Sequence, residues 1–116
     1  MKQSYGGGAL LEELTCAKQL SRFFPLVVPV RMTVQITAQR NGAAALRETA
    51  VIEFCGQEHA IFVSSLPLEF DDRVRLQRDA REGAQEASVV AVQYHEGRKA
   101  VAVRFLQSAC DWVTQT

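Results

Sequence analysis

The side chains that could carry chemistry in this chain are few and far apart in the sequence. They are two histidines and three cysteines: His59, His95, Cys16, Cys55 and Cys110. Cys55 and His59 are close enough in sequence to suggest a nucleophile and its base. Such a pair also needs an orienting group and an oxyanion site, and the sequence has no pattern for either. The cysteines lack C-x-x-C spacing, so a zinc site is not indicated. We therefore expect no enzymatic activity, no metal and no cofactor.

Two pairs of adjacent carboxylates, Glu12-Glu13 and Asp71-Asp72, are candidates for acid–base chemistry. Neighbouring side chains diverge on a strand or turn, so we interpret both pairs as solvated helix and turn positions. The glycines at positions 6–8 suggest a phosphate loop, but no strand precedes them and no Gly-Lys-Ser/Thr follows. We predict that residues 1–8 form a flexible arm and that residues 9–116 form one domain.

Arginines recur on the expected outer faces of two strands, at Arg31, Arg73 and Arg75, with Arg78 just beyond. This row could bind RNA or another anion, or it could be an ordinary wet sheet face paired with nearby acids. Base stacking needs exposed aromatic side chains, and Tyr94 stands alone. Thirteen basic and thirteen acidic side chains give no bulk charge that would attract nucleic acid or an anionic membrane. Nucleic-acid binding is therefore an alternative and not the first expectation.

The composition indicates one globular domain. The chain has 116 residues, of which 47% are hydrophobic and 22% charged, so it can bury a core of its own. An odd number of separated cysteines suits a reducing compartment better than a disulfide framework. No apolar run approaches the ~20 residues of a membrane span, and the N-terminus does not resemble a signal peptide. We expect a cytoplasmic protein without membrane insertion, and the sequence leaves its oligomeric state open.

The elements that must position these residues are mostly strands. Alternating or valine-rich apolar runs between turn residues predict six of them. They are Val28–Thr37, Arg47–Phe54, His59–Ser64, Arg73–Gln77, Glu86–Tyr94 and Arg98–Leu106. The connection His95–Gly97 predicts a hairpin between the last two, and the spacing is typical of an antiparallel barrel. An apolar stripe predicts a helix from Ala9 to Phe24 that Pro25 stops, and a short helix or tail begins at Ser108.

The period of two also predicts which side chains enter the core. On the fourth strand Val74 and Leu76 point inward, while on the second strand Ala50, Ile52 and Phe54 share one side. Residues 40–42 are predicted to form a turn. Three aromatic side chains are assigned to the core or its cover, with an exposed docking patch as the alternative: Phe23, Phe24 and Trp112.

The order of elements and several local motifs resemble PilZ domains, the small six-stranded barrels that many bacteria use in cyclic di-GMP signalling. Leu66–Leu76 resembles the family's pLp-x-G-x-x-V-x-L segment, with Asp71 or Asp72 where a glycine is usual. Ala102–Leu106 resembles its closing G-V-x-F strand, and Asp111-Trp112 fits the start of its trailing helix. The resemblance covers about residues 18–113. It implies an all-β fold, a six-stranded antiparallel PilZ-like β-barrel with an N-terminal helix and a short C-terminal helix.

The ligand motifs of the family are altered in this chain. PilZ domains that bind cyclic di-GMP carry R-x-x-x-R just before the first strand, and the nearest match here runs from Lys18 to Arg22. A guanidinium donates in a fork to phosphate and stacks on a base, and the ammonium of Lys18 does neither as well. The second motif, D-x-S-x-x-G, aligns with Phe54–His59, where Phe54, Gly56 and His59 replace the acid, the serine and the glycine.

The resemblance implies a PilZ-like signalling adaptor that is not an enzyme, has a degraded nucleotide site and acts by protein–protein contacts. One alternative is a genuine cyclic di-GMP receptor that uses Lys18 and Arg22 as ligand-binding residues. Another is a small barrel that binds RNA or another anion. Lys18 and Arg22 could also extend along the surface at a helix C-terminus without binding anything.

Overall fold

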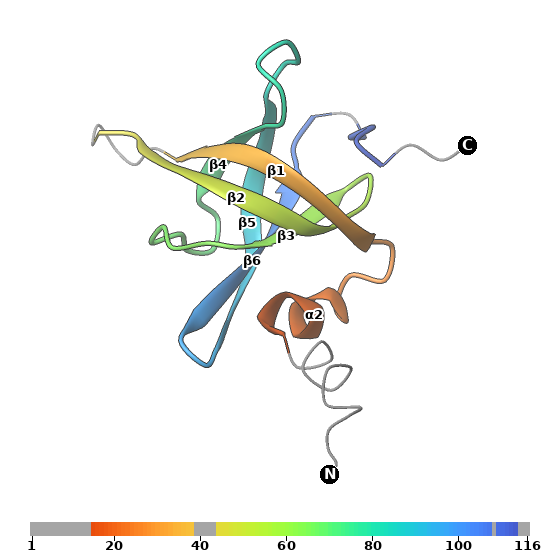
Figure 1. The fold of residues 1–116 in the computed structure, drawn as a ribbon, viewed down its shortest axis with the longest axis vertical. Helices are drawn as coiled ribbons and strands as arrows, with labels where there is room; N and C mark the ends of the chain where they lie inside the picture. Colours follow the sequence, from red (N-terminus) through yellow and green to blue (C-terminus); the bar gives the residue numbers. More distant parts are fainter. Residues whose placement is uncertain (1–14, 39–43, 108, 114–116) are drawn as a thin grey trace.

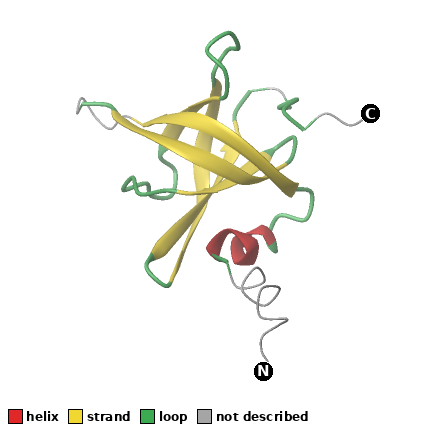
Figure 2. Ribbon diagram, viewed as in Figure 1, coloured by secondary structure: helices red, strands yellow, loops and turns green. Residues whose placement is uncertain are grey.

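The computed structural model describes residues 15–38, 44–107 and 109–113, which form a closed antiparallel barrel of six strands with one short helix outside it (Figures 1 and 2). The elements are α2 Cys16–Ser21, β1 Val28–Ala38, β2 Leu46–Cys55, β3 His59–Val63, β4 Arg73–Gln77, β5 Gln85–His95 and β6 Arg98–Phe105. Their order is β1-β2-β3-β6-β5-β4, and β4 pairs back to β1. The predicted barrel is confirmed, and every strand end lies within one residue of its predicted position.

Two turns place non-glycine residues in the left-handed backbone region. In the β5–β6 hairpin His95 pairs with Arg98, so the connection is two residues long and not three as predicted. Glu96 and Gly97 have φ of 51° and 79°, as a two-residue turn matched to the strand twist requires. Asp71, before β4, has φ of 76°. The PilZ pattern expects a glycine in this turn, and aspartate is among the few residues that tolerate this conformation.

The barrel interior holds most of the apolar side chains. On β4, Val74 and Leu76 are buried while Arg73 and Arg75 are exposed, as the alternation predicts. The inner cluster includes Val34, Ile36, Ile52, Phe62, Val74, Leu76, Val89, Val101, Val103 and Phe105. Strands with one apolar and one wet face close into a barrel because closure buries the apolar face and leaves no free sheet edge.

The helix covers a second, smaller apolar surface on the outside of the barrel. Cys16, Ala17 and Leu20 of α2 pack against side chains of β3 and β6 that are completely buried. Those strand residues are Ile61, Ala100 and Ala102. Because Ala100 and Ala102 are small, the helix backbone can approach β6 closely. Both faces of β6 are therefore buried over this stretch.

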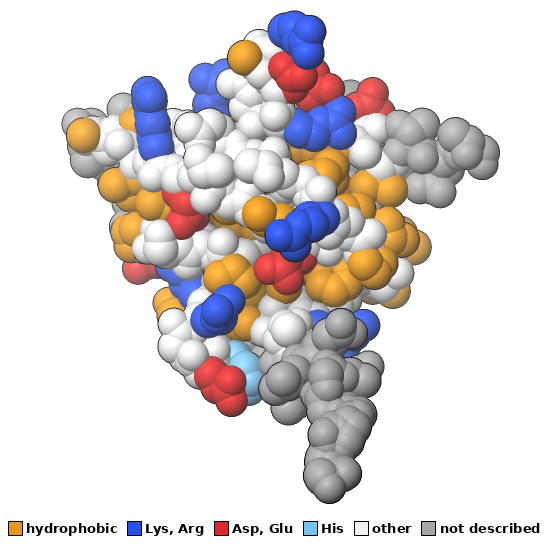
Figure 3. Space-filling view, viewed as in Figure 1, with side chains coloured by type: hydrophobic (Ala, Val, Ile, Leu, Met, Phe, Trp, Pro, Cys, Tyr) orange, Lys and Arg blue, Asp and Glu red, His pale blue; other side chains and the backbone are white. Residues whose placement is uncertain are grey.

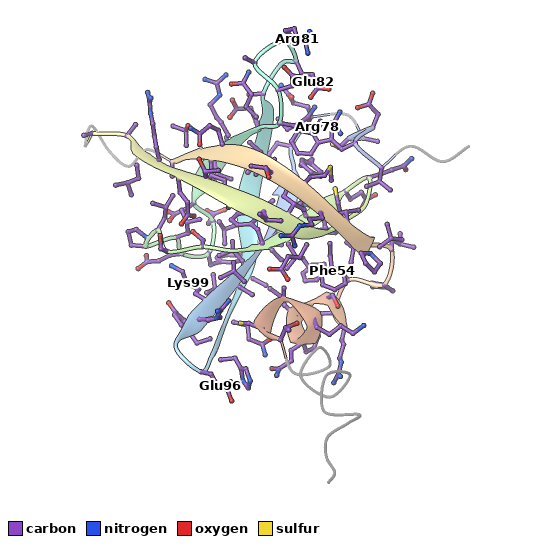
Figure 4. The ribbon with its side chains drawn as sticks, viewed as in Figure 1. Phe54, Arg78, Arg81, Glu82, Glu96 and Lys99 are labelled. Carbon is purple, nitrogen blue, oxygen red and sulfur yellow. The ribbon has the colours of Figure 1, made fainter. Side chains whose placement is uncertain are left out.

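A bulge in β2 turns Phe54 to the face opposite the predicted one. Ile52 pairs with Phe62 and Phe54 with Ile61, so the register shifts between Ile52 and Phe54. Ile52 lies in the barrel interior, whereas Phe54 packs on the outside with the cluster beneath α2 (Figure 4). The prediction that both share one side is wrong, because an extra residue in one strand moves every later side chain to the other face. Cys55, the next residue, consequently points into the core.

The helical flanks differ from the prediction. Thr15 is extended, and its hydroxyl accepts a hydrogen bond from the Lys18 N–H at 3.1 Å and caps α2. This helix begins at Cys16 and ends at Ser21, before the predicted end at Phe24. Residues 9–14, the predicted arm at 1–8 and the predicted turn at 40–42 lie outside the described residues. At the C-terminus, residues 109–113 are not helical, because Trp112 folds back against the end of the barrel. No helix in the described part of the chain is long and apolar enough to cross a membrane.

Candidate functional site

An apolar groove of about 460 Å³ lies on the barrel surface where α2 connects to β1. One bank is this connection, and the other is the turn between β2 and β3. The lining residues are Phe23, Phe24, Pro25, Leu26, Val27, Val28, Gly56, Gln57, Glu58, His59 and Val113. Figure 3 shows hydrophobic side chains gathered at the side of the molecule where β1 begins. Below, the first bank means residues 22–28 and the second bank means residues 56–59.

The first bank is a series of turns that follows the end of α2. The Phe23 and Phe24 N–H groups donate to the carbonyls of Leu20 and Ser21, and the Val27 N–H donates to Phe24. Pro25 has no N–H and follows these turns, but α2 itself ends at Ser21 and not at Phe24 as predicted. This path leaves the side chains of Phe23 and Leu26 73% and 80% exposed. The bank therefore presents large apolar groups to solvent.

The second bank is held by hydrogen bonds from other parts of the chain. The Gly56 N–H donates to the His59 carbonyl at 2.8 Å and closes a tight turn. The carbonyl of Gln57 accepts from the Cys110 N–H, and the carbonyl of Glu58 accepts from the Phe105 N–H, both at 2.9 Å. These two carbonyls are thus bonded to the chain's own backbone, and the turn is fixed to β6 and the C-terminal segment.

The two banks touch at Gly56. A Cβ atom added there would lie 2.9 Å from the Leu26 carbonyl oxygen and 3.5 Å from the Val27 Cα. Side-chain carbons do not come this close to backbone atoms, so the contact requires a glycine. Gly56 stands where the PilZ ligand motif has its serine. The space beside that position is filled by the backbone of the first bank.

His59 is a half-buried member of the groove. Its ring lies 4.8 Å from the ring of Phe24, centroid to centroid, at a tilt of 52°. Burial lowers the pKa of His59, the carboxylate of Glu58 partly offsets this, and the nearby Arg104 lowers the pKa further. The imidazole is therefore neutral at pH 7, and the groove floor carries no positive charge there.

The lowered pKa of His59 predicts a loss of stability in mild acid. The folded-state pKa lies below the unfolded value of 6.5, so the native state resists protonation. The contribution of His59 to the free energy of unfolding is fully present above the unfolded-state pKa. It is lost as the pH falls through the folded-state pKa. Urea unfolding between about pH 7.5 and pH 5 should show a falling free energy of unfolding. His59→Phe should flatten this part of the curve. If the curve of His59→Phe stayed equally steep and that of a His95→Gln control became flat, the pH dependence would arise from His95 and the prediction would be wrong.

The predicted ligand residues do not line the groove. Lys18 is half-buried on α2. Arg22 is exposed at the helix C-cap, where its N–H bonds to the carbonyls of Gln19 and Leu20. Of the three residues that replace the second motif, Gly56 and His59 lie in the groove and Phe54 lies beneath α2.

The docking patch considered from the sequence comprises Phe23, Phe24 and Trp112. It does not include Leu26 or Val28. The structure places the two phenylalanines in the groove and buries Trp112 in the core cluster. The unbroken apolar run around Pro25 was the available signal, because an apolar stretch that is neither strand nor helix has no regular face to bury.

Half of the predicted arginine row is ion-paired. Arg75 contacts Glu86 at 2.9 Å across the β4–β5 ladder. Arg78 donates two hydrogen bonds to Glu82, at 2.7 and 3.2 Å, and its guanidinium lies 5.3 Å from the ring centre of Trp112 (Figure 4). Arg31 and Arg73 are exposed. Two of the four arginines thus follow the interpretation of a wet sheet face paired with acids.

Comparison with known proteins supports the fold. No protein-family model and no curated protein matches the chain. Among solved structures, it is similar to the Bacillus subtilis inhibitor of motility, MotI/DgrA, with a TM-score of 0.50 and 13% identity over 72% of this chain. The match spans 42% of the length of that protein, which is less than half. At this identity the likeness concerns the fold alone, and it agrees with a PilZ-like barrel.

Proposed function

We propose that this chain is a non-enzymatic PilZ-like adaptor domain of bacterial cyclic di-GMP pathways, which acts through protein contacts at the groove and not by holding the nucleotide. The observation that carries the proposal is the chemistry of the groove. It lies between residues 23–28, which follow the segment matched to the first ligand motif, and the turn that replaces the second motif. Exposed apolar side chains stand there in place of charged donors.

Charge argues against a nucleotide in the groove. Cyclic di-GMP carries two phosphates, which proteins hold with arginine forks or lysine. Among the described residues that line the groove there is no lysine or arginine, and the one carboxylate, Glu58, repels phosphate. His59 is neutral at pH 7 because burial lowers its pKa. A phosphate placed here would lose its hydration shell without gaining a cationic partner, and this makes its binding free energy unfavourable.

The contact at Gly56 is a second argument. A nucleotide held by the second motif segment needs room beside Gly56, and here the Leu26 carbonyl packs directly on that residue. Opening this contact would also disturb the turn that Gln57 and Glu58 hold to the C-terminal segment. The direct contact between the banks thus competes with a ligand at this position.

Titration calorimetry with cyclic di-GMP tests the proposal. We expect no heat of binding at micromolar concentrations of protein. Micromolar or tighter binding would contradict the lost site. If such binding disappeared in Arg22→Ala, the genuine receptor that uses Lys18 and Arg22 would be favoured instead. A signal unchanged in Arg22→Ala would place the nucleotide elsewhere.

The protein contact can be tested in the cell with a photoreactive amino acid. At position 26 in the groove it should give discrete cross-linked products with protein. At position 70 it should give none, because Phe70 is 72% exposed but does not line the groove. The same products from both positions would mean that exposure alone determines the cross-linking, and the groove would then not be the contact surface.

A further inference from the structure

Exposed apolar side chains are concentrated at the groove. Six large hydrophobic residues are exposed in the described part of the chain, and three of them line this one feature. These three are Phe23, Leu26 and Val28, while Phe70, Tyr94 and Leu106 lie elsewhere. Single exposed apolar residues are normal, but a contiguous group of them marks an interaction surface.

This surface offers both a projection and a recess. Phe23 and Leu26 project from the first bank, and the hollow of about 460 Å³ lies directly beside them. A two-fold dimer buries the same patch on both copies, so the patch must contain both a projection and a recess that fits it. The first bank supplies the projection, and the floor between the banks supplies the recess.

The charges at the rim are complementary when the two-fold axis runs along the groove. Arg22 lies on the first bank and Glu58 on the second, and both are exposed. When two copies meet about a two-fold axis that runs along the groove, the first bank of each faces the second bank of the other. Arg22 of one copy then approaches Glu58 of the other, twice per dimer, and like charges are kept apart.

We propose that the groove binds a second copy of this chain, in an isologous dimer in which Phe23 and Leu26 of each copy enter the groove of the other. The inference rests on the proposed function in one respect, since it takes the groove as a protein-contact surface. Eleven residues line the groove, against roughly 20–30 per side in a stable interface of standard size. The dimer is therefore weak, with dissociation in the micromolar range.

Sedimentation velocity over a range of concentrations from nanomolar to high micromolar tests the dimer. We expect a monomer–dimer equilibrium in the native chain. Leu26→Glu should weaken it by roughly 100-fold, about tenfold for each of the two symmetric positions, because each introduces a charge into an apolar contact. Phe70→Glu is the matched control and should leave the equilibrium unchanged. A monomer at all concentrations, or an equal effect of the two substitutions, would overturn the proposal.

A charge exchange tests the two-fold register separately from folding. Arg22→Glu and Glu58→Arg should each dimerise several-fold more weakly than the native chain, since each homodimer contains two like-charge contacts. An equimolar mixture of the two variants should regain the native affinity, because in the heterodimer both contacts are again of opposite sign. If the mixture is no stronger than either variant alone, this register is wrong.

The outcomes also separate this inference from the proposed function. A chain that binds no cyclic di-GMP but remains monomeric overturns the dimer and leaves the adaptor proposal in place. A chain that dimerises through Leu26 and also binds cyclic di-GMP overturns the adaptor proposal and retains the dimer.

Discussion

Replacing Trp112 with alanine is expected to lower the free energy of unfolding by about 3–5 kcal/mol, the usual cost of removing a large buried aromatic side chain. Trp112 is 9% exposed although it follows the last strand. Its ring packs edge-on against Phe105, with centroids 5.9 Å apart, and Arg78 lies over it. The Cys110 N–H ties the same segment to the β2–β3 turn. Chemical denaturation monitored by circular dichroism measures the change.

Thiol labelling gives this substitution a second, more local readout. Cys55 and Cys110 belong to the same core cluster as Trp112. Burial raises the pKa of Cys55 to about 12, with a smaller contribution from Cys110, and burial also raises the pKa of Cys110. Both thiols are therefore protonated and inert in the native fold. In Trp112→Ala we expect both to be labelled faster, whereas Cys16, which is buried on α2 in the other cluster, stays protected.

Two results would contradict this account of the C-terminal segment. One is a loss of less than about 1 kcal/mol, which would mean that the segment covers little of the core. The other is equally fast labelling of all three cysteines, which would indicate general unfolding and not a local opening of the barrel end.

Gly56→Ala is expected to destabilise the chain by about 1–3 kcal/mol, the typical cost of forcing an extra carbon into a packed site. The added Cβ would stand 2.9 Å from the Leu26 carbonyl oxygen, and both groups belong to hydrogen-bonded turns. Glycine-to-alanine substitution otherwise stabilises a folded chain slightly, because it restricts the unfolded state. The sign of the change therefore reports directly on the contact between the two banks.

Gly83→Ala is the matched control for this prediction. No atom lies within 4 Å of a Cβ added at Gly83. We expect its free energy of unfolding to change by less than about 0.5 kcal/mol, as for most surface substitutions. Urea denaturation of the two variants side by side measures the difference. If Gly56→Ala proved as stable as Gly83→Ala, the banks would not be in contact in solution, and the argument that this contact competes with a nucleotide would fail.

The sequence by itself determined the six strands and their antiparallel barrel class, whereas the order of the strands around the barrel came from the structure. Each strand is marked by the period of two or by a run of β-branched residues, and turn residues mark its ends. These signals are local and independent of the rest of the chain. Val74 and Leu76 show this, because their burial follows from alternation alone. The altered ligand motifs at Lys18–Arg22 and Phe54–His59 were equally visible in the sequence.

Only the tertiary structure decided which way side chains point where the two-residue alternation of a strand is interrupted. The bulge in β2 moved Phe54 out of the barrel and beneath α2, and no feature of the local sequence marks it. α2 begins at Cys16, where Thr15 caps it, within the apolar stripe. The contact of Gly56 with Leu26 joins segments some thirty residues apart in the sequence and brings the two banks of the groove together. Strand patterns arise from neighbouring residues, whereas this groove arises from the packing of distant turns, and only the folded chain brings those turns together.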